Sequence, residues 1–275
     1  MRIEIFDLDG TLTNEGYPLW NLITEKAVLN RDEFIRIAQE WKLDVTNNPH
    51  KYPNKRTASK EMTELGIRMF RPEFSNAKAV RAIAKDAGHF IHEVGGIRLD
   101  AISYLRCRIN QGFSCVISTA SYLEGAQGFM DCLAELRLLS KDDVGKIIFC
   151  GTRTKWDTST VVHTNADDGK TEELQRVFCR DIKDLSGSIH AVFGDDPEIN
   201  DRSLLMLGSH SFAIPTTRNT HASLPDNCVW ATWEQILANK DNIANFHKNL
   251  MLPNKPADST PSVEKQEYAS PGIRL

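Results

Sequence analysis

Short apolar runs rich in β-branched residues recur along the chain and alternate with stretches that have an apolar residue every three or four positions. The short runs predict buried parallel strands over residues 3–6, 113–118, 146–151, 189–194 and 211–215. The longer stretches predict helices over residues 99–111, 124–139, 170–184 and 201–208. Strands and helices in alternation predict an α/β fold with a doubly wound, Rossmann-like parallel sheet.

Between residues 14 and 95 the strand pattern stops and a helical spacing replaces it. In RDEFIRIAQEWKL, Phe34 and Ile37 fall on one face of a helix. The segments TASKEMTELGIRMF and SNAKAVRAIAKDAGHFIHEV are also helical, with Thr57 and Ser75 as their expected N-caps. The pattern therefore predicts an all-helical insert after the first strand.

The insert is long enough to form a small domain of its own. We expect a core domain made of residues 1–14 and 96–245, and a helical cap made of residues 15–95. After about residue 250 the chain is rich in proline, serine and charged residues, which predicts a disordered tail over residues 250–275.

Acidic and hydroxyl side chains stand where the predicted strands end. They are Asp7, Asp9, Ser118, Thr119, Asp195 and Asp196. In open α/β sheets, ligands bind outside the carboxyl ends of the strands. A buried carboxylate is costly unless it is paired or bound to a metal. The pattern therefore places a candidate site for a metal or an anion at this edge.

Composition narrows the class of protein and of partner. Of 275 residues, 41% are hydrophobic and 25% charged, as in an ordinary globular protein, and the net charge of −4 gives no electrostatic case for nucleic acid. No apolar run reaches the length of a membrane span, so no membrane partner is expected. Six scattered cysteines without a CxxC pair predict reduced thiols in a cytoplasmic protein. No signal peptide is expected, since only Met1 and Arg2 precede the first strand.

Four short motifs resemble those of the haloacid dehalogenase superfamily of phosphatases. They are FDLDGTL, ISTAS, the lysine of DDGKTEEL, and FGDDPEIND, in the order of that family and within about residues 1–240. The helical insert resembles the C1 cap of the phosphoserine phosphatase-like branch. The resemblance implies a magnesium-dependent phosphatase that hydrolyses a small phosphorylated metabolite, a phosphomonoester, through an aspartyl-phosphate intermediate.

The resemblance also implies a role for individual residues. The catalytic set would be Asp7 as nucleophile, Asp9 as general acid and base, Thr119 and Lys170. The phosphate-binding residues would be Leu8, Gly10, Ser118 and Ala120. The metal ligands would come from Asp7, Asp9 through its backbone carbonyl, Asp195, Asp196 and Asp201. Magnesium prefers such hard oxygen ligands, and it reduces the repulsion between an anionic nucleophile and a phosphate.

Several assignments stay open from the sequence. Ser118 competes with Thr119 for the second motif, and Lys155 competes with Lys170 for the third. Asp201 is either a metal ligand or the N-cap of the helix that follows it.

The substrate and the reaction also leave alternatives. Glu15 could meet a substrate amino group, and Arg56, Arg68 and Arg71 could meet a carboxylate, but all four also fit a solvated helix face. A phosphotransferase with an alcohol acceptor is a second enzyme hypothesis. A catalytically weak protein-binding module that uses the cap and tail is a third.

Overall fold

The computed structural model describes residues 1–252. The predicted tail lies outside this range except for its first residues, and residues 250 and 251 are the end of the last helix, α12 (Ile243–Met251). Among residues 1–252, no helix combines the length and the apolar character needed to cross a bilayer.

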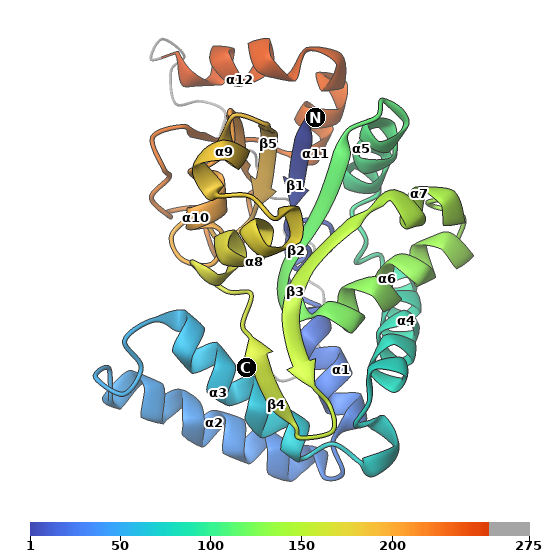
Figure 1. Cartoon of the computed structure of the whole chain (residues 1–275), viewed down its shortest axis with the longest axis vertical. Coiled ribbons are helices and arrows are strands. Elements are labelled where there is room, and N and C mark those ends of the chain that lie inside the picture. Colours follow the sequence, from blue (N-terminus) through green and yellow to red (C-terminus); the bar gives the residue numbers. More distant parts are fainter. Residues whose placement is uncertain (253–275) are drawn as a thin grey trace.

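A seven-stranded sheet forms the centre of the molecule, in the order β4-β3-β2-β1-β5-β6-β7 (Figure 1). Neighbouring strands are parallel except β3 and β4, which are antiparallel. The strands are β1 (Ile3–Phe6), β2 (Ser114–Tyr122), β3 (Ile148–Lys155), β4 (Thr160–His163), β5 (Ile189–Gly194), β6 (His210–Ala213) and β7 (Cys228–Trp230). The predicted doubly wound α/β sheet is therefore confirmed.

Helices cover both faces of this sheet. One face carries α5 (Leu99–Asn110), α6 (Leu123–Glu135) and α11 (Trp233–Ala238), and α7 (Lys141–Lys146) follows α6 on the same side (Figure 1). The other face carries α8 (Gly169–Phe178), α9 (Ile182–Ser186) and α10 (Arg202–Leu205).

Alternate residues of β1 face the two sides of the sheet. Ile3 and Ile5 belong to the smaller core cluster, with Leu174 of α8, and Phe6 belongs to the larger one, with Tyr104 of α5. Burial on both faces explains why every residue of β1 except Glu4 is apolar. The buried carboxylate of Glu4 is paired with the guanidinium of Arg108, as a buried charge requires.

The segment between β1 and α5 is helical, as predicted. Its helices are α1 (Leu19–Ala27), α2 (Arg31–Asn47), α3 (Lys55–Arg68) and α4 (Ala77–Glu93), with a short 3-10 turn at Pro72–Phe74. Figure 1 shows α1, α2 and α3 at the end of the sheet toward which β2 and β3 run. In contrast, α4 packs along α6, where Arg81 lies 2.6 Å from Asp131.

The two ends of this insert meet. Thr13 forms a β-bridge with Ile97, and the N–H of Asn14 donates to the carbonyl of Gly96 at 2.7 Å. The chain therefore leaves and re-enters the sheet domain at one place.

Two predicted N-caps are wrong. The side chain of Asn54, and not Thr57, caps α3 by accepting the N–H of Thr57 at 2.9 Å. The side chain of Asn76, and not Ser75, caps α4 by accepting the N–H of Ala79. In both cases an asparagine three residues before an N–H donor supplies the cap.

Some predicted helices are too long. The helix expected over residues 170–184 is two helices, because Cys179 takes a left-handed conformation with φ of 49° and ends α8. The helix expected over residues 124–139 ends at Glu135, and that expected over residues 201–208 is α10 alone.

Candidate functional site

The turn after β1 brings the first aspartates to the carboxyl edge of the sheet. Asp7 follows β1 directly, and its N–H donates to the carbonyl of Phe193 at 2.9 Å. Gly10 then has φ of 86°, and a Cβ at this position would overlap the carboxylate of Asp195. Only glycine allows this close approach. The carboxylate of Asp9 accepts the N–H of Leu19, at the start of α1, at 2.7 Å.

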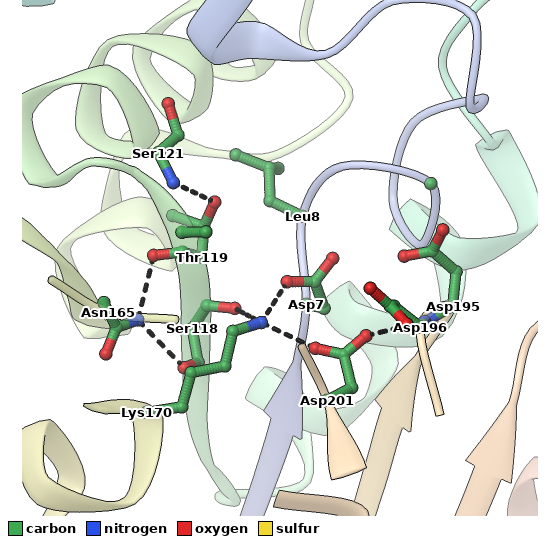
Figure 2. Close-up of polar contacts among 12 residues, drawn as sticks. Asp7, Leu8, Ser118, Thr119, Ser121, Asn165, Lys170, Asp195, Asp196 and Asp201 are labelled. Atoms are coloured by element: carbon green, nitrogen blue, oxygen red, sulfur yellow. Dashed lines mark hydrogen bonds and ion pairs between the residues drawn. The ribbon is translucent and has the colours of Figure 1, made fainter. Parts of the chain in front are cut away.

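Lys170 joins two aspartates at the floor of the site (Figure 2). Its Nζ lies 2.6 Å from Oδ1 of Asp7 and 2.6 Å from Oδ1 of Asp201, and it donates to the carbonyl of Ser118 at 3.3 Å. Lys170 is only 1% exposed, whereas Lys155 is exposed at the end of β3. The geometry thus favours Lys170 over Lys155 as the third-motif lysine.

Asp201 holds the loop after β5 in place. It occupies the N-cap position of α10, but its side chain makes no capping bond there. Its Oδ2 instead accepts the backbone N–H groups of Asp195 at 3.0 Å and Asp196 at 2.9 Å. The carboxylate of Asp201 therefore does not act as the N-cap of α10, which was one of the two roles left open by the sequence.

Three carboxylates converge beside Lys170. Oxygens of Asp7, Asp195 and Asp201 all lie within 4.8 Å of one another. The carboxylate of Asp196 does not belong to this group. It instead accepts a hydrogen bond from Nζ of Lys55 at 2.8 Å. One buried ammonium thus faces three carboxylates, which leaves an excess of negative charge.

Burial shifts the pKa values of this site, and the excess of negative charge adds to the shift at Asp7 and Asp195. Burial, with the neighbouring Asp201, raises the pKa of Asp7 well above its usual range. Burial, with Asp7 and Asp201, does the same to the pKa of Asp195. Burial also disfavours the charged form of Lys170, but Asp201 and Asp7 still hold its pKa above the usual value. Burial raises the pKa of Asp9 to about 6.

The acidic group fits a divalent cation. All its donors are hard carboxylate oxygens, which Mg²⁺ prefers, and a double positive charge would offset the excess that raises the pKa values of Asp7 and Asp195. Asp7, Asp195 and Asp201 are thus the residues whose side chains could hold a metal ion.

The end of β2 presents Thr119 and Ala120 to a cavity, while Ser118 points into the protein toward Asn165 (Figure 2). This placement favours Thr119 over Ser118 as the second-motif residue. The side chain of Leu8 lies in the larger core cluster, so only its backbone is available for phosphate binding. The neighbouring Gly10 lines the cavity.

The cavity has a volume of about 200 Å³. Its lining residues are Asp7, Asp9, Gly10, Glu15, Pro18, Lys55, Thr119, Ala120, Asp195, Asp196, Asn200, Asp201 and Arg218. Sequence reasoning missed Pro18, Lys55, Asn200 and Arg218. Pro18, Lys55 and Arg218 carry no motif signal, because folding of the cap and of the loop after β6 brings them to the site. Asn200 stands within the fourth motif but was not singled out.

Three residues considered for substrate binding are held by protein partners. Glu15 lines the cavity, and its carboxylate accepts the N–H of Thr217 at 3.0 Å. Both terminal nitrogens of Arg56 bind the carboxylate of Glu172 at 2.6 Å, which joins α3 of the insert to α8. Arg71 donates to the carbonyl of Lys26, at 2.7 Å, within the insert.

No family profile matches the chain, and neither does any curated protein. Solved structures do resemble it. A protein of unknown function from Bordetella pertussis Tohama I is 16% identical, and the match covers 78% of this chain and 91% of that one with a TM-score of 0.50. Cytosolic 5'-nucleotidase IIIB bound to cytidine is 13% identical, with 90% and 86% covered and a TM-score of 0.53.

A phosphoserine phosphatase in its apo form is 15% identical over 86% of this chain and 98% of its own, with a TM-score of 0.48. At such identities a structural likeness establishes the fold. The α/β fold expected from the alternation of strands and helices is confirmed, and the chain shares this fold with cytosolic 5'-nucleotidase IIIB.

Proposed function

We propose that the protein is a phosphatase that hydrolyses small phosphomonoesters through an aspartyl-phosphate on Asp7. The observation that carries the proposal is the position of Asp7, which is bound to Lys170 and opens on the same cavity as Asp9 and Thr119. Transfer of a phosphoryl group to a carboxylate requires a nucleophile, a proton donor and a group that binds the phosphate. Asp7, Asp9 and the hydroxyl of Thr119 supply these beside one cavity.

Two steps follow from this arrangement. An oxygen of Asp7 attacks phosphorus, the bond from phosphorus to the leaving oxygen breaks, and that oxygen takes a proton from Asp9. Asp9 then takes a proton from water as the water attacks phosphorus and the bond to Asp7 breaks, which releases phosphate. A pKa of about 6 suits Asp9 to both roles near neutral pH.

The remaining polar residues orient the reacting groups. Lys170 binds Oδ1 of Asp7, which fixes the direction of its other oxygen. Thr119 would donate its hydroxyl hydrogen to a phosphate oxygen. Magnesium, when bound by Asp7 and Asp195, would reduce the repulsion between the attacking carboxylate and the phosphate.

Magnesium is expected to stabilise the fold as well as to support activity. It would offset the charges of Asp7, Asp195 and Asp201 only in the folded state, so the unfolding temperature of chelator-treated protein should rise with added magnesium. Asp195→Asn should remove most of this rise. Thermal unfolding at increasing magnesium concentration measures both. An equal rise in the wild type and the variant, or full activity after exhaustive chelation, would contradict the assignment.

The cavity supports a small and polar substrate. Its volume of about 200 Å³ lies below the range typical of sites for drug-sized ligands, roughly 300–1,000 Å³. Within the described part of the chain, its lining includes no aromatic ring on which a nucleobase could stack. The nucleotidase that shares the fold was solved with cytidine, so nucleotides provide the informative comparison.

A panel of phosphomonoesters tests the proposed function. Released phosphate would be measured with magnesium for phosphorylated amino acids, sugar phosphates, nucleoside monophosphates and phosphoproteins. We expect the highest kcat/KM among the small, non-aromatic compounds. Absence of turnover on the whole panel would overturn the phosphatase assignment. A preference of about tenfold or more for phosphoproteins would contradict a small-molecule substrate and indicate that the cap is a docking surface for proteins.

Lys55→Ala is expected to raise KM several-fold with little change in kcat. Six acidic residues line the cavity, and Lys55 and Arg218 are the cations among the lining residues, so losing Lys55 weakens the attraction for a phosphate dianion. The ion pair with Asp196 is partly exposed, with side chains 38% and 31% exposed, so its loss should cost less than about 1 kcal/mol of stability.

The matched control for this variant is Lys51→Ala. Lys51 precedes α3 and also pairs with an acid, Asp44, at 2.8 Å, but it does not line the cavity. Its KM should equal that of the wild type in the same steady-state assay. An unchanged KM in Lys55→Ala would show that Lys55 does not contribute to substrate binding.

A further inference from the structure

The end of β2 departs from regular pairing at the candidate site. Ser118 pairs with Cys150 of β3, and Tyr122 pairs with Thr152, so β2 advances four residues while β3 advances two. Residues 119–121 therefore form a bulge. A bulge re-aims side chains, and here both Thr119 and Ala120 reach the cavity.

Bulged backbone groups lose their partners in the sheet and must find others. The side-chain amide of Asn165 donates to the carbonyl of Thr119 at 2.9 Å and to that of Cys150 at 3.0 Å. The hydroxyl of Thr152 donates to the carbonyl of Ala120 at 2.7 Å. Side chains from outside β2 thus bind both carbonyls of the bulge, and the hydroxyl of Thr119 itself accepts the N–H of Ser121 at 3.0 Å.

Asn165 is the centre of this network (Figure 2). Its side-chain nitrogen also lies 3.3 Å from Oγ of Ser118, and its backbone N–H donates to Oγ1 of Thr152 at 3.1 Å. The residue is fully buried and does not line the cavity. It stands in the short connection between β4 and α8, five positions before Lys170. The same short connection therefore leads to both the bulge support and the lysine.

We propose that Asn165 is a positioning residue, which holds the bulge of β2 so that the hydroxyl of Thr119 faces the substrate phosphate. The effect of Asn165 on turnover rests on the proposed phosphatase function. Its role in holding the bulge of β2 does not depend on that function. Because Asn165 is out of reach of the substrate, its effect on turnover passes through Thr119.

A double-mutant cycle separates positioning from a general loss of stability. Asn165→Ala should lower kcat/KM by about tenfold to a hundredfold, as expected for a catalytic group displaced by about 1 Å. Thr119→Val removes the hydroxyl at constant shape. If Asn165 acts by placing that hydroxyl, the double variant should be no slower than Thr119→Val alone. Additive losses would overturn the proposal.

Asn227 provides the matched control. Its side-chain amide also donates to two carbonyls, those of Leu205 and Gly208 at 2.9 Å, and lies 3.4 Å from Oγ of Ser211. It stands just before β7, at the amino end of the strand and away from the cavity. Asn227→Ala should lower stability and leave kcat/KM within about twofold of wild type. A loss of kcat/KM equal to that of Asn165→Ala would contradict positioning.

Hydrogen exchange gives a readout that does not depend on turnover. In Asn165→Ala, backbone amides of residues 117–122 should exchange faster than in the wild type and in Asn227→Ala. Unchanged protection there would overturn the support of the bulge, whereas a wild type without phosphatase activity would overturn only the proposed function. If Asn165→Ala does not fold, the near-isosteric Thr152→Val removes the bond to Ala120 and should show the same local loss of protection.

Discussion

Replacing Asp7 with asparagine should abolish phosphomonoester hydrolysis and, without metal, make the protein more stable. An amide is a poor nucleophile, so kcat should fall by at least about a thousandfold. The pKa of Asp7 is raised by burial and by Asp201, so its charge costs stability at neutral pH. The variant leaves Lys170 paired with Asp201 and relieves this cost. Steady-state kinetics and urea unfolding in chelator measure the two effects.

The control for this variant is Glu4→Gln in β1, the strand that Asp7 follows. Glu4 is also fully buried, and it is paired with Arg108 at 3.1 Å and with His190 at 3.0 Å, away from the cavity. Its loss should lower stability and spare kcat, the reverse of the result at Asp7. Retention of a tenth of wild-type kcat in Asp7→Asn, about 1.4 kcal/mol of barrier, would refute the nucleophile assignment.

Replacing Lys170 with methionine should remove activity and destabilise the metal-free protein by about 3–5 kcal/mol. The substitution leaves the buried carboxylates of Asp7 and Asp201 without the ammonium that lies 2.6 Å from each. Lys170 is only 1% exposed, so water cannot replace its ammonium in compensating the two carboxylates. Urea unfolding in chelator measures the loss, and added magnesium should restore part of it.

Lys155→Met is the corresponding control. Lys155 is exposed at the end of β3, so its replacement should change neither kcat nor the free energy of unfolding by more than about 0.5 kcal/mol. If Lys170→Met were as stable as this control in the absence of metal, the buried cluster would not need its cation, and the charge argument would fail.

The residues that the sequence predicted at one edge of the sheet, and that line one cavity in the structure, stand next to parallel strands. Asp7, Thr119 and Asp195 each stand at or near the end of a short β-branched run, and parallel strands carry their ends to one edge of the sheet. Local pattern and topology were therefore sufficient to bring them together. The loop after β5 was less predictable, because Asp201 reaches the site by folding back onto the N–H groups of Asp195 and Asp196.

The features of the site and sheet that the sequence did not predict depend on tertiary contacts. Lys55 enters the cavity because α3 lies against the sheet domain, where it meets Asp196. Asn165 acts through the carbonyls of a bulge, which leaves no periodic signal. β4 (Thr160–His163) pairs antiparallel with β3 and alternates exposed and buried residues, so it lacks the continuous apolar run from which strands were predicted elsewhere in the chain.

The hydrogen bond between Asn14 and Gly96, which joins the two ends of the helical insert, affects how well changes in the length of the insert are tolerated. A segment whose two ends are already fastened side by side adds little closure entropy as it lengthens, because the cost grows only with the logarithm of its length. Insertions and deletions between these ends are therefore tolerated far better than changes at Asp7 or Lys170. The helices between these ends can therefore be replaced as one unit while the carboxyl edge of the sheet, with Asp7 and Lys170, stays unchanged.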